Sequence, residues 1–223
     1  MAEAQPLALF ACYLIVHPLR AENEVRARHH LHCAGIQAIT VVRGSLPVGL
    51  SVNDRDAAIA RSHHRCITHF LAHHGDRDKH LLLCEDDVVF APDVNPTEVV
   101  HDAILKLAQH APYWRTLHVG HIPCCPTLPV LFSRKLCVSP APGTAHAILW
   151  NRAYLRALHA SLPMCAWRRP RVMEFQTALP WYAKFALVHS IASQNQRPKE
   201  LQTIDNWSLG ISELLHYDDI ATL

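Results

Sequence analysis

Apolar and polar residues divide the first half of the chain into short and long blocks. Short apolar runs at 7–16, 36–42 and 80–84 are rich in leucine, isoleucine and valine, a composition typical of strands buried on both faces. The segments between them, 22–35 and 53–75, begin with acidic or capping residues and end at a glycine, which indicates helices. This alternating order predicts an α/β fold in which right-handed crossovers join parallel strands.

A third helix is predicted over 95–112, where Asn95 can cap the N-terminus, Pro96 suits the first turn and Pro112 follows the end. Beyond this helix the pattern is less regular, but no linker divides the chain, so one domain over 1–223 is expected. The strands expected in this second half span 116–120, 129–138, 143–150 and 184–190, and the helices span 151–162 and 173–183.

Composition is that of a globular domain. The chain has 223 residues, of which 50% are hydrophobic and 18% charged, so disorder is not expected. Its formal net charge of +2 argues against a nucleic-acid partner. The apolar run at 7–16 is too short to cross a bilayer and lacks the basic flank of a signal peptide. No other stretch of the sequence is long and apolar enough to be transmembrane.

The cysteines and histidines invite a redox or zinc interpretation. None of the 8 cysteines falls in a C-x-x-C pair, which favours reduced, buried thiols and a cytoplasmic location. The 18 histidines include dense segments such as "RHHLH" and "AHHGDRDKH", but the closed Cys/His spacings of zinc sites are missing. Exposed histidines on helices are the simpler interpretation, and a structural zinc site is the alternative.

The segment "LLLCEDDVVF" (81–90) places three adjacent carboxylates, Glu85, Asp86 and Asp87, inside an apolar run. Adjacent carboxylates repel one another unless a cation neutralises them. These three follow the third predicted strand, and ligands of such sheets collect at the carboxyl ends of the strands. Mg²⁺ or Mn²⁺, which prefers oxygen ligands, suits this position. The alternative is a solvated acidic turn in which a carboxylate caps a backbone N–H.

The glycine content limits the ways in which the chain could bind a nucleotide. The chain has 7 glycines and neither a G-x-x-x-x-G-K-[ST] nor a G-x-G-x-x-G motif, so a nucleotide diphosphate would need a metal and basic side chains. The spacing Glu85-x-Asp87 is of the "DxD" type of nucleotide-sugar transferases. Asp87 is the best metal ligand, and Glu85 or Asp86 would reach the metal or the ribose. The base and ribose of a nucleotide-sugar donor would lie over the ends of the first two strands, near His17, Arg20 and Arg43. For each of these residues the alternative is a solvated charge on the surface.

Several segments, taken in order, resemble the lipooligosaccharide and collagen β-galactosyltransferase family. The likeness is carried by "ARSHHRCITHFL" (60–71), "LLLCEDDVVF" (81–90), "WRTLHVG" (114–120), "GTAHAILWNRAYLRAL" (143–158) and "FALVHSIASQNQRPKEL" (185–201). The resemblance implies a GT-A-type fold, with a Rossmann-like, mostly parallel sheet flanked by helices on both faces. The chain departs from the family after the first strand, where only Arg20 matches its Asn-Leu-Asp-Arg segment.

The resemblance also implies roles for single residues. It places Ser62 and His63 on the donor side and Gly143 and Thr144 on the acceptor side. For Ser62 the alternative is a residue that only caps or packs.

Two further residues enter through the resemblance. Glu174 is the nearest acid before the last strand, and it could take the proton from an acceptor hydroxyl in an inverting displacement, with Asp86 as the rival base. His189 follows the apolar run "FALV" and is expected as a second metal ligand at a strand end. The alternatives are an acid in the first turn of a helix for Glu174 and a packed or solvent-exposed imidazole for His189.

Taken together, these features predict a cytoplasmic glycosyltransferase that depends on Mn²⁺ or Mg²⁺. It would move a hexose from a nucleotide-diphosphate sugar, UDP-linked, to a glycan or sugar hydroxyl. Residues 1–112 would form the nucleotide-sugar-binding half and residues 113–223 the acceptor half. Two other classes use the same acidic strand end: a metal-dependent phosphohydrolase or nucleotidyltransferase, and a catalytically inactive module that binds nucleotide sugars.

Overall fold

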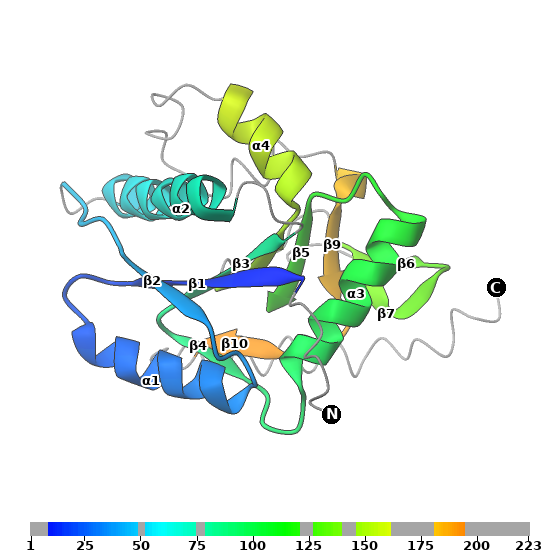
Figure 1. Ribbon diagram of the computed structural model, residues 1–223, viewed down its shortest axis with the longest axis horizontal. Helices are drawn as coiled ribbons and strands as arrows, with labels where there is room; N and C mark the ends of the chain where they lie inside the picture. The colour runs from blue at the N-terminus through cyan, green and yellow to red at the C-terminus, as the bar shows by residue number, and fades with distance from the viewer. Residues whose placement is uncertain are drawn as a thin grey trace, which may run out of the picture.

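An eight-stranded mixed sheet runs through the centre of the protein (Figure 1). The computed structural model describes residues 9–48, 52–74, 79–120, 127–139, 146–161 and 181–194. The strand order across the sheet is β2-β1-β3-β8-β5-β9-β7-β6. These strands are β1 (Phe10–Val16), β2 (Ile39–Arg43), β3 (His80–Glu85), β5 (Thr116–Gly120), β6 (Leu128–Val130), β7 (Ser133–Val138), β8 (Ala147–Trp150) and β9 (Lys184–Leu187). A separate two-stranded sheet pairs β4 (Val88–Phe90) with β10 (Ala192–Gln194).

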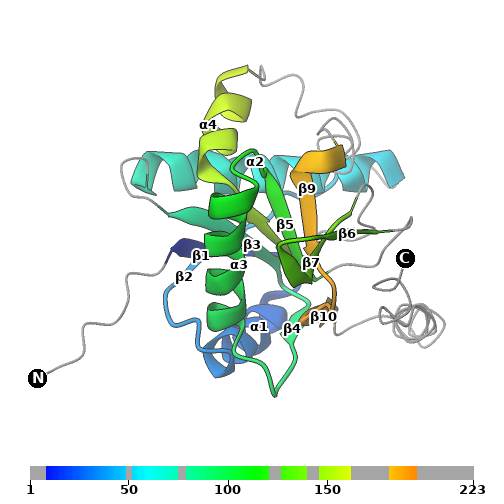
Figure 2. The same ribbon diagram turned by 90° about the vertical axis from the view of Figure 1, so that its right-hand side faces the viewer.

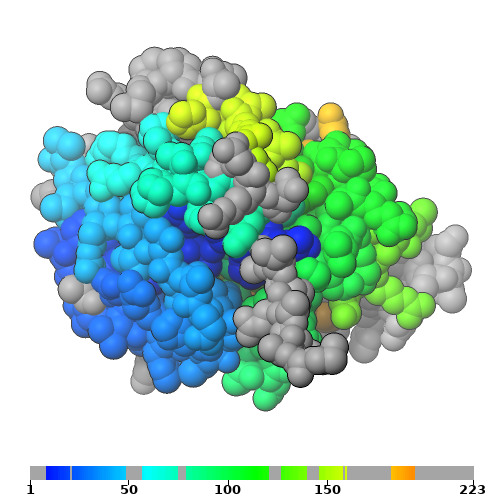
Figure 3. Space-filling view, viewed as in Figure 1, coloured from blue at the N-terminus to red at the C-terminus, as the bar shows by residue number. Residues whose placement is uncertain are grey.

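Helices cover both faces of the central sheet, as Figures 1 and 2 show. On one face lie α1 (Ala21–Cys33) and α3 (Pro96–His110). On the other, α2 (Val52–His74) and α4 (Arg152–Ser161) lie side by side (Figure 3). A short 3-10 helix, η2 (Trp181–Ala183), precedes β9. The predicted α/β architecture, a largely parallel sheet with helices on both faces, is confirmed.

Two apolar cores arise from the alternation of side chains along the buried strands. Leu14 of β1 and Leu82 of β3 belong to the core under α1 and α3, whereas Tyr13 and Leu83 belong to the core under α2 and α4. All four residues are 0% exposed. Because successive residues of a strand point to opposite faces, a strand covered on both faces requires apolar residues at every position. This requirement explains the continuous apolar runs of the sequence.

Strand β1 lies between β2 and β3 and is parallel to both. Val16, the last residue of β1, is paired with Arg43 of β2, and Ile15 is paired with Glu85 of β3. The three strands predicted in the first half of the chain are therefore parallel neighbours in one buried sheet, as expected. Their carboxyl ends lie at one edge, so the loops that follow them meet there.

The second half of the sheet differs from the prediction. The strand expected over 129–138 is the antiparallel hairpin β6–β7, because residues 131 and 132 form a turn. The apolar residues after the carboxylates do not continue β3, because residues 86 and 87 form a turn and β4 pairs with β10 instead. β9 ends at Leu187 rather than at residue 190. Segments 143–145 and 173–180, where a strand start and a helix were predicted, lie outside the described residues.

The predicted cap of the third helix is confirmed in the same structure. Oδ1 of Asn95 caps α3 by accepting hydrogen bonds from the main-chain N–H groups of Thr97 and Glu98, at 3.1 and 3.4 Å. Within the described part of the chain every cysteine is free, and all of them except Cys33 are buried. None of the described helices combines the length and the apolar character that crossing a membrane requires.

Gly120 ends β5 at the point where the chain that leads into β10 crosses it. A Cβ atom on Gly120 would overlap Nε2 of His146 and stand 2.5 Å from the carbonyl oxygen of Ala192. These two groups are themselves in contact, with 3.1 Å between Nε2 and the oxygen, so neither is free to move aside. We expect Gly120→Ala to lower the free energy of unfolding by about 2 kcal/mol, a typical cost of overpacking, as measured by urea denaturation.

Gly44→Ala is the matched control for this prediction. Its added methyl would stand 3.3 Å from the carbonyl oxygen of Val16 and 3.4 Å from Oγ of Ser62, distances that a small shift relieves. The Gly44 variant should therefore lose less stability than the Gly120 variant. Equal losses of stability in the two variants would contradict the explanation that the close contact at Gly120 causes the destabilisation.

Candidate functional site

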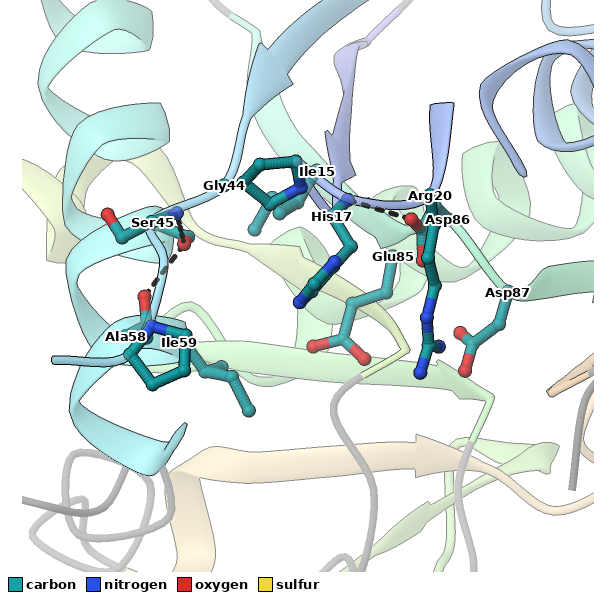
Figure 4. Close-up of a pocket in the computed structure, with 13 residues that line it drawn as sticks. Ile15, His17, Arg20, Gly44, Ser45, Ala58, Ile59, Glu85, Asp86 and Asp87 are labelled. Carbon is teal, nitrogen blue, oxygen red and sulfur yellow. Dashed lines mark hydrogen bonds between the residues drawn. The ribbon is translucent and has the colours of Figure 1, made fainter. Parts of the chain in front are cut away.

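A cavity of about 280 Å³ opens at the edge of the sheet where β1, β2 and β3 end. Residues from all three strand ends and from helix α2 line it, and Figure 4 shows them converging. The lining consists of Ile15, His17, Pro18, Arg20, Gly44, Ser45, Pro47, Ala58, Ile59, Ser62, Glu85, Asp86 and Asp87. The structure thus places the three adjacent carboxylates at the carboxyl edge of parallel strands, as the sequence pattern predicted.

Asp86 holds the loop that follows β1. Its Oδ2 accepts a hydrogen bond of 2.7 Å from the main-chain N–H of His17 (Figure 4). Asp86 is 8% exposed, so this bond offsets part of the cost of removing a carboxylate from water. One oxygen of Asp86 is therefore committed to joining the ends of β1 and β3. This is the capping arrangement that the sequence left open as the structural alternative.

Glu85 faces a buried histidine. Nε2 of His63, on α2, lies 3.6 Å from Oε1 of Glu85. The His63 side chain is 3% exposed and that of Glu85 is 23% exposed. Among the described residues neither ring nitrogen of His63 has a hydrogen-bond partner. His63 therefore lies behind the cavity wall, where it can orient Glu85 but does not itself line the opening.

Glu85, Asp87 and Arg20 extend to the same side of the cavity in Figure 4. Arg20 is exposed and directly precedes α1, whereas Asp87 is partly buried in the turn between β3 and β4. Two carboxylates and one guanidinium thus face a common space. Such a set can meet an anionic ligand through Arg20 and a cation through the carboxylates.

Glu85 and Asp87 suit a hard divalent cation as ligands, because both offer carboxylate oxygens. Within the described ranges no group of three His, Cys, Asp or Glu side chains is placed to hold a metal ion. The protein's share of such a site would therefore be these two carboxylates. The remaining positions would fall to substrate phosphates and water, which is the usual coordination of Mg²⁺ with nucleotides.

Ser62 fixes the wall of the cavity formed by β2 and α2. Its Oγ accepts a hydrogen bond of 2.8 Å from the main-chain N–H of Ser45 and donates one of 2.7 Å to the carbonyl oxygen of Ala58. Ser62 is 3% exposed. Its hydroxyl is thus used to bind the loop after β2 to the helix, and its contribution to the cavity is the position of that loop.

Two predicted residues lie away from the cavity. Arg43 is paired with Glu24 of α1, with 2.6 Å between Nη2 and Oε2, and it is absent from the lining. His189 is exposed and follows β9. The register of β10 with β4 places Gln194 opposite Val88, next to the carboxylate turn, and so leaves His189 beyond the other end of β4. The structure does not bring His189 to the carboxylates.

Three predicted residues, Glu174, Gly143 and Thr144, lie outside the described residues. Other residues of the cavity were not predicted. Its apolar side is formed by Pro18, Pro47, Ala58 and Ile59. The signal that could have found the first two is their position just after a predicted strand, because every loop after a parallel strand of this sheet reaches the same edge.

Comparisons with known proteins give a coarse likeness in fold. No protein-family model matches the sequence, and no curated protein matches it. A similar solved structure is described as the "crystal structure of a glycosyltransferase involved in the glycosylation of the major capsid of PBCV-1". Its TM-score is 0.40 at 10% identity, over 78% of this chain and 81% of that chain. A likeness of this degree concerns the path of the chain alone, so the function proposed below rests on the cavity.

Asp86 offers a test of the way the edge of the cavity is held. We expect Asp86→Ala to lower the free energy of unfolding by about 2 kcal/mol, because the main-chain N–H of His17 loses a charged acceptor. Asp86→Asn keeps an acceptor oxygen and should lose clearly less. Asp93→Ala, at an exposed aspartate, is the control and should change stability little. Equal losses in the alanine and asparagine variants, measured by urea denaturation, would contradict the role of this hydrogen bond.

Proposed function

We propose that the protein is a glycosyltransferase whose cavity binds a nucleotide-diphosphate sugar together with Mn²⁺ or Mg²⁺. The observation that supports this most is the meeting of Glu85, Asp87 and Arg20 at the carboxyl edge of three parallel strands. Such edges are where α/β proteins bind nucleotides. The chain has no glycine-rich phosphate loop, so a metal held by carboxylates and a basic side chain would perform that task.

Each part of the cavity suits one part of such a donor. Glu85 and Asp87 would hold the cation, and Arg20 would contact diphosphate oxygens from the α1 side. The apolar side, with Pro47 and Ile59, would contact the base or ribose. When bound, Mn²⁺ or Mg²⁺ would offset the charge that develops on the leaving diphosphate. The donor we propose is UDP-linked, and the acceptor is a glycan or sugar hydroxyl, as in the galactosyltransferase family that the sequence resembles.

The base that takes the proton from the acceptor is proposed to be Glu174. Asp86 is the weaker candidate because it is buried and one of its oxygens already accepts the N–H of His17. A base must reach the acceptor hydroxyl directly or through one water. His189 is not included in the proposed metal site, since the register of β10 holds it away from Asp87.

Product analysis tests this function against the two other classes. The protein would be incubated with UDP-hexoses and Mn²⁺, first alone and then with sugar acceptors. A glycosyltransferase releases UDP and yields a longer glycan, or slowly releases free hexose when no acceptor is present. Release of phosphate or UMP would indicate a phosphohydrolase instead. UDP binding without any turnover would indicate an inactive binding module, and either result would contradict the proposal.

We expect Asp87→Asn to abolish the rise in melting temperature that UDP causes in the presence of Mn²⁺. An amide oxygen carries no net charge to offset the cation, while the similar shape of the side chain should preserve the fold. The matched control is Asp93→Asn, an exposed aspartate beyond β4, which should respond to UDP and Mn²⁺ as the parent does. If Asp87→Asn responds like the parent, Asp87 is not a metal ligand.

His189→Ala is expected to leave the Mn²⁺-dependent response to UDP unchanged. The reason is its place beyond the far end of β4, together with its exposure to solvent. The measurement is the melting temperature with UDP, in the presence and absence of Mn²⁺. A loss of UDP affinity confined to the samples with Mn²⁺ would restore His189 as a metal ligand and would contradict the site proposed here.

A further inference from the structure

The loop that follows β2, residues 44–47, forms one wall of the candidate site; we call it the wall loop. Gly44, Ser45 and Pro47 belong to the lining of the cavity. Ser45 and Asp87 lie on opposite sides of the cavity in Figure 4. Surface loops are usually more mobile than the elements they connect, so a ligand that contacts this wall would have to order it unless the protein already does so.

Two main-chain N–H groups of the wall loop are bound to neighbouring elements. The N–H of Gly44 donates a hydrogen bond of 2.8 Å to the carbonyl oxygen of Val16, the last residue of β1. The N–H of Ser45 donates the bond of 2.8 Å to Oγ of Ser62 that was described above. A Cβ atom on Gly44 would stand 3.4 Å from the same Oγ, so the loop lies directly against α2.

Two arginines of α2 bind the carbonyl groups on either side of these N–H groups. Nη2 of Arg61 donates a hydrogen bond of 3.2 Å to the carbonyl oxygen of Leu46. Nη1 of Arg65 donates one of 2.9 Å to the carbonyl oxygen of Arg43. The two arginines are four residues apart on a helix, so both extend from the same side of α2. Each residue from 43 to 46 therefore has a main-chain group bound to β1 or α2.

Neither arginine belongs to the lining of the cavity. Arg65 is exposed and Arg61 is half-buried. Their hydrogen bonds to the loop end on main-chain oxygens, so they constrain the path of the backbone at the cavity wall. Replacing either side chain would leave every lining residue in place. An effect of such a replacement on a bound ligand would have to pass through the wall loop or through the loss of positive charge.

We propose that Arg61 and Arg65 are positioning residues that hold the wall loop in the shape that binds the base and ribose of the donor. The inference rests on the proposed function, in which the apolar side of the cavity near Pro47 contacts that part of the nucleotide. A loop that is ordered before binding loses less conformational freedom when the ligand arrives. The two arginines thus act on the nucleoside, whereas Glu85 and Asp87 act on the diphosphate through the cation.

The double variant Arg61→Met/Arg65→Met tests this division. Methionine keeps most of the apolar length of arginine but donates no hydrogen bond. Titration calorimetry should show UDP binding with Mg²⁺ weakened about tenfold. The dissociation constant of pyrophosphate with Mg²⁺, obtained from its displacement of UDP, should equal that of the parent. The control is Arg134→Met, at an exposed arginine of β7, which should bind both ligands like the parent.

Hydrogen exchange reports on the wall loop directly. In the free protein, a peptide that contains residues 44–47 should exchange faster in the double variant than in the parent, because the carbonyl groups at both ends of the loop lose their anchors. Peptides from β1 and β3 should exchange at the same rate in both proteins. That comparison, together with circular dichroism, separates a local change in the loop from a loss of the fold.

Two kinds of failure are distinguishable. Equal weakening of UDP and pyrophosphate would overturn the inference, because it would show an effect of positive charge on the diphosphate. Unchanged UDP affinity, or exchange of the loop at the parent's rate, would overturn it as well. A parent that does not bind UDP with Mg²⁺, or UDP that pyrophosphate does not displace, would instead contradict the proposed function itself and this inference with it.

Discussion

Strand β1 is hydrogen-bonded on both sides and covered on both faces, and the position of the cavity depends on this burial. Its alternate residues, among them Tyr13 and Leu14, enter different cores. A shift of one residue in register would exchange the two sets of side chains. The register with β2 and β3 is therefore strongly specified, and it holds the ends of all three strands at one level. The loops that carry Arg20, Ser45 and the carboxylates meet for this reason.

The three adjacent carboxylates have different surroundings. Asp86 accepts a main-chain N–H and is buried. Glu85 faces the imidazole of His63, and Asp87 lines the cavity with Arg20. The hydrogen bond from the main-chain N–H of His17 stabilises the charge of Asp86. Glu85 and Asp87 remain as the carboxylates proposed to hold a cation.

The two ends of β3 have opposite chemistry. Carboxylates collect where the strand ends, whereas Lys79 and His80 stand where it begins and meet Arg152 and Arg156. The residues between, Leu81 to Cys84, are 0% exposed and apolar. Polar groups are excluded from the strand by burial on both faces, so charge gathers at its ends.

The sequence by itself determined the central strands, the helices between them and the edge at which ligands would bind. These features follow from local patterns: apolar runs, capping residues such as Asn95, and acids placed directly after a strand. It also predicted that His17, Arg20 and Asp86 would share an edge, because the loops after neighbouring parallel strands meet there. Their contact with a nucleotide-sugar donor stays a prediction. The short strand β4 and the β6–β7 hairpin were missed, since two-residue turns inside apolar runs leave little trace in the pattern.

Tertiary structure decided which side chains face the cavity and which do not. Arg43 and Arg20 both follow strands in this region, yet Arg43 is paired with Glu24 while Arg20 lines the cavity. His189 was expected at the metal, but the pairing of β10 with β4 carries it elsewhere. The antiparallel pairing of β3 with β8 likewise brings His80 beside Arg152 at the start of α4. Such pairings join residues distant in the chain through backbone hydrogen bonds and packing, and a local pattern of residue types does not encode them.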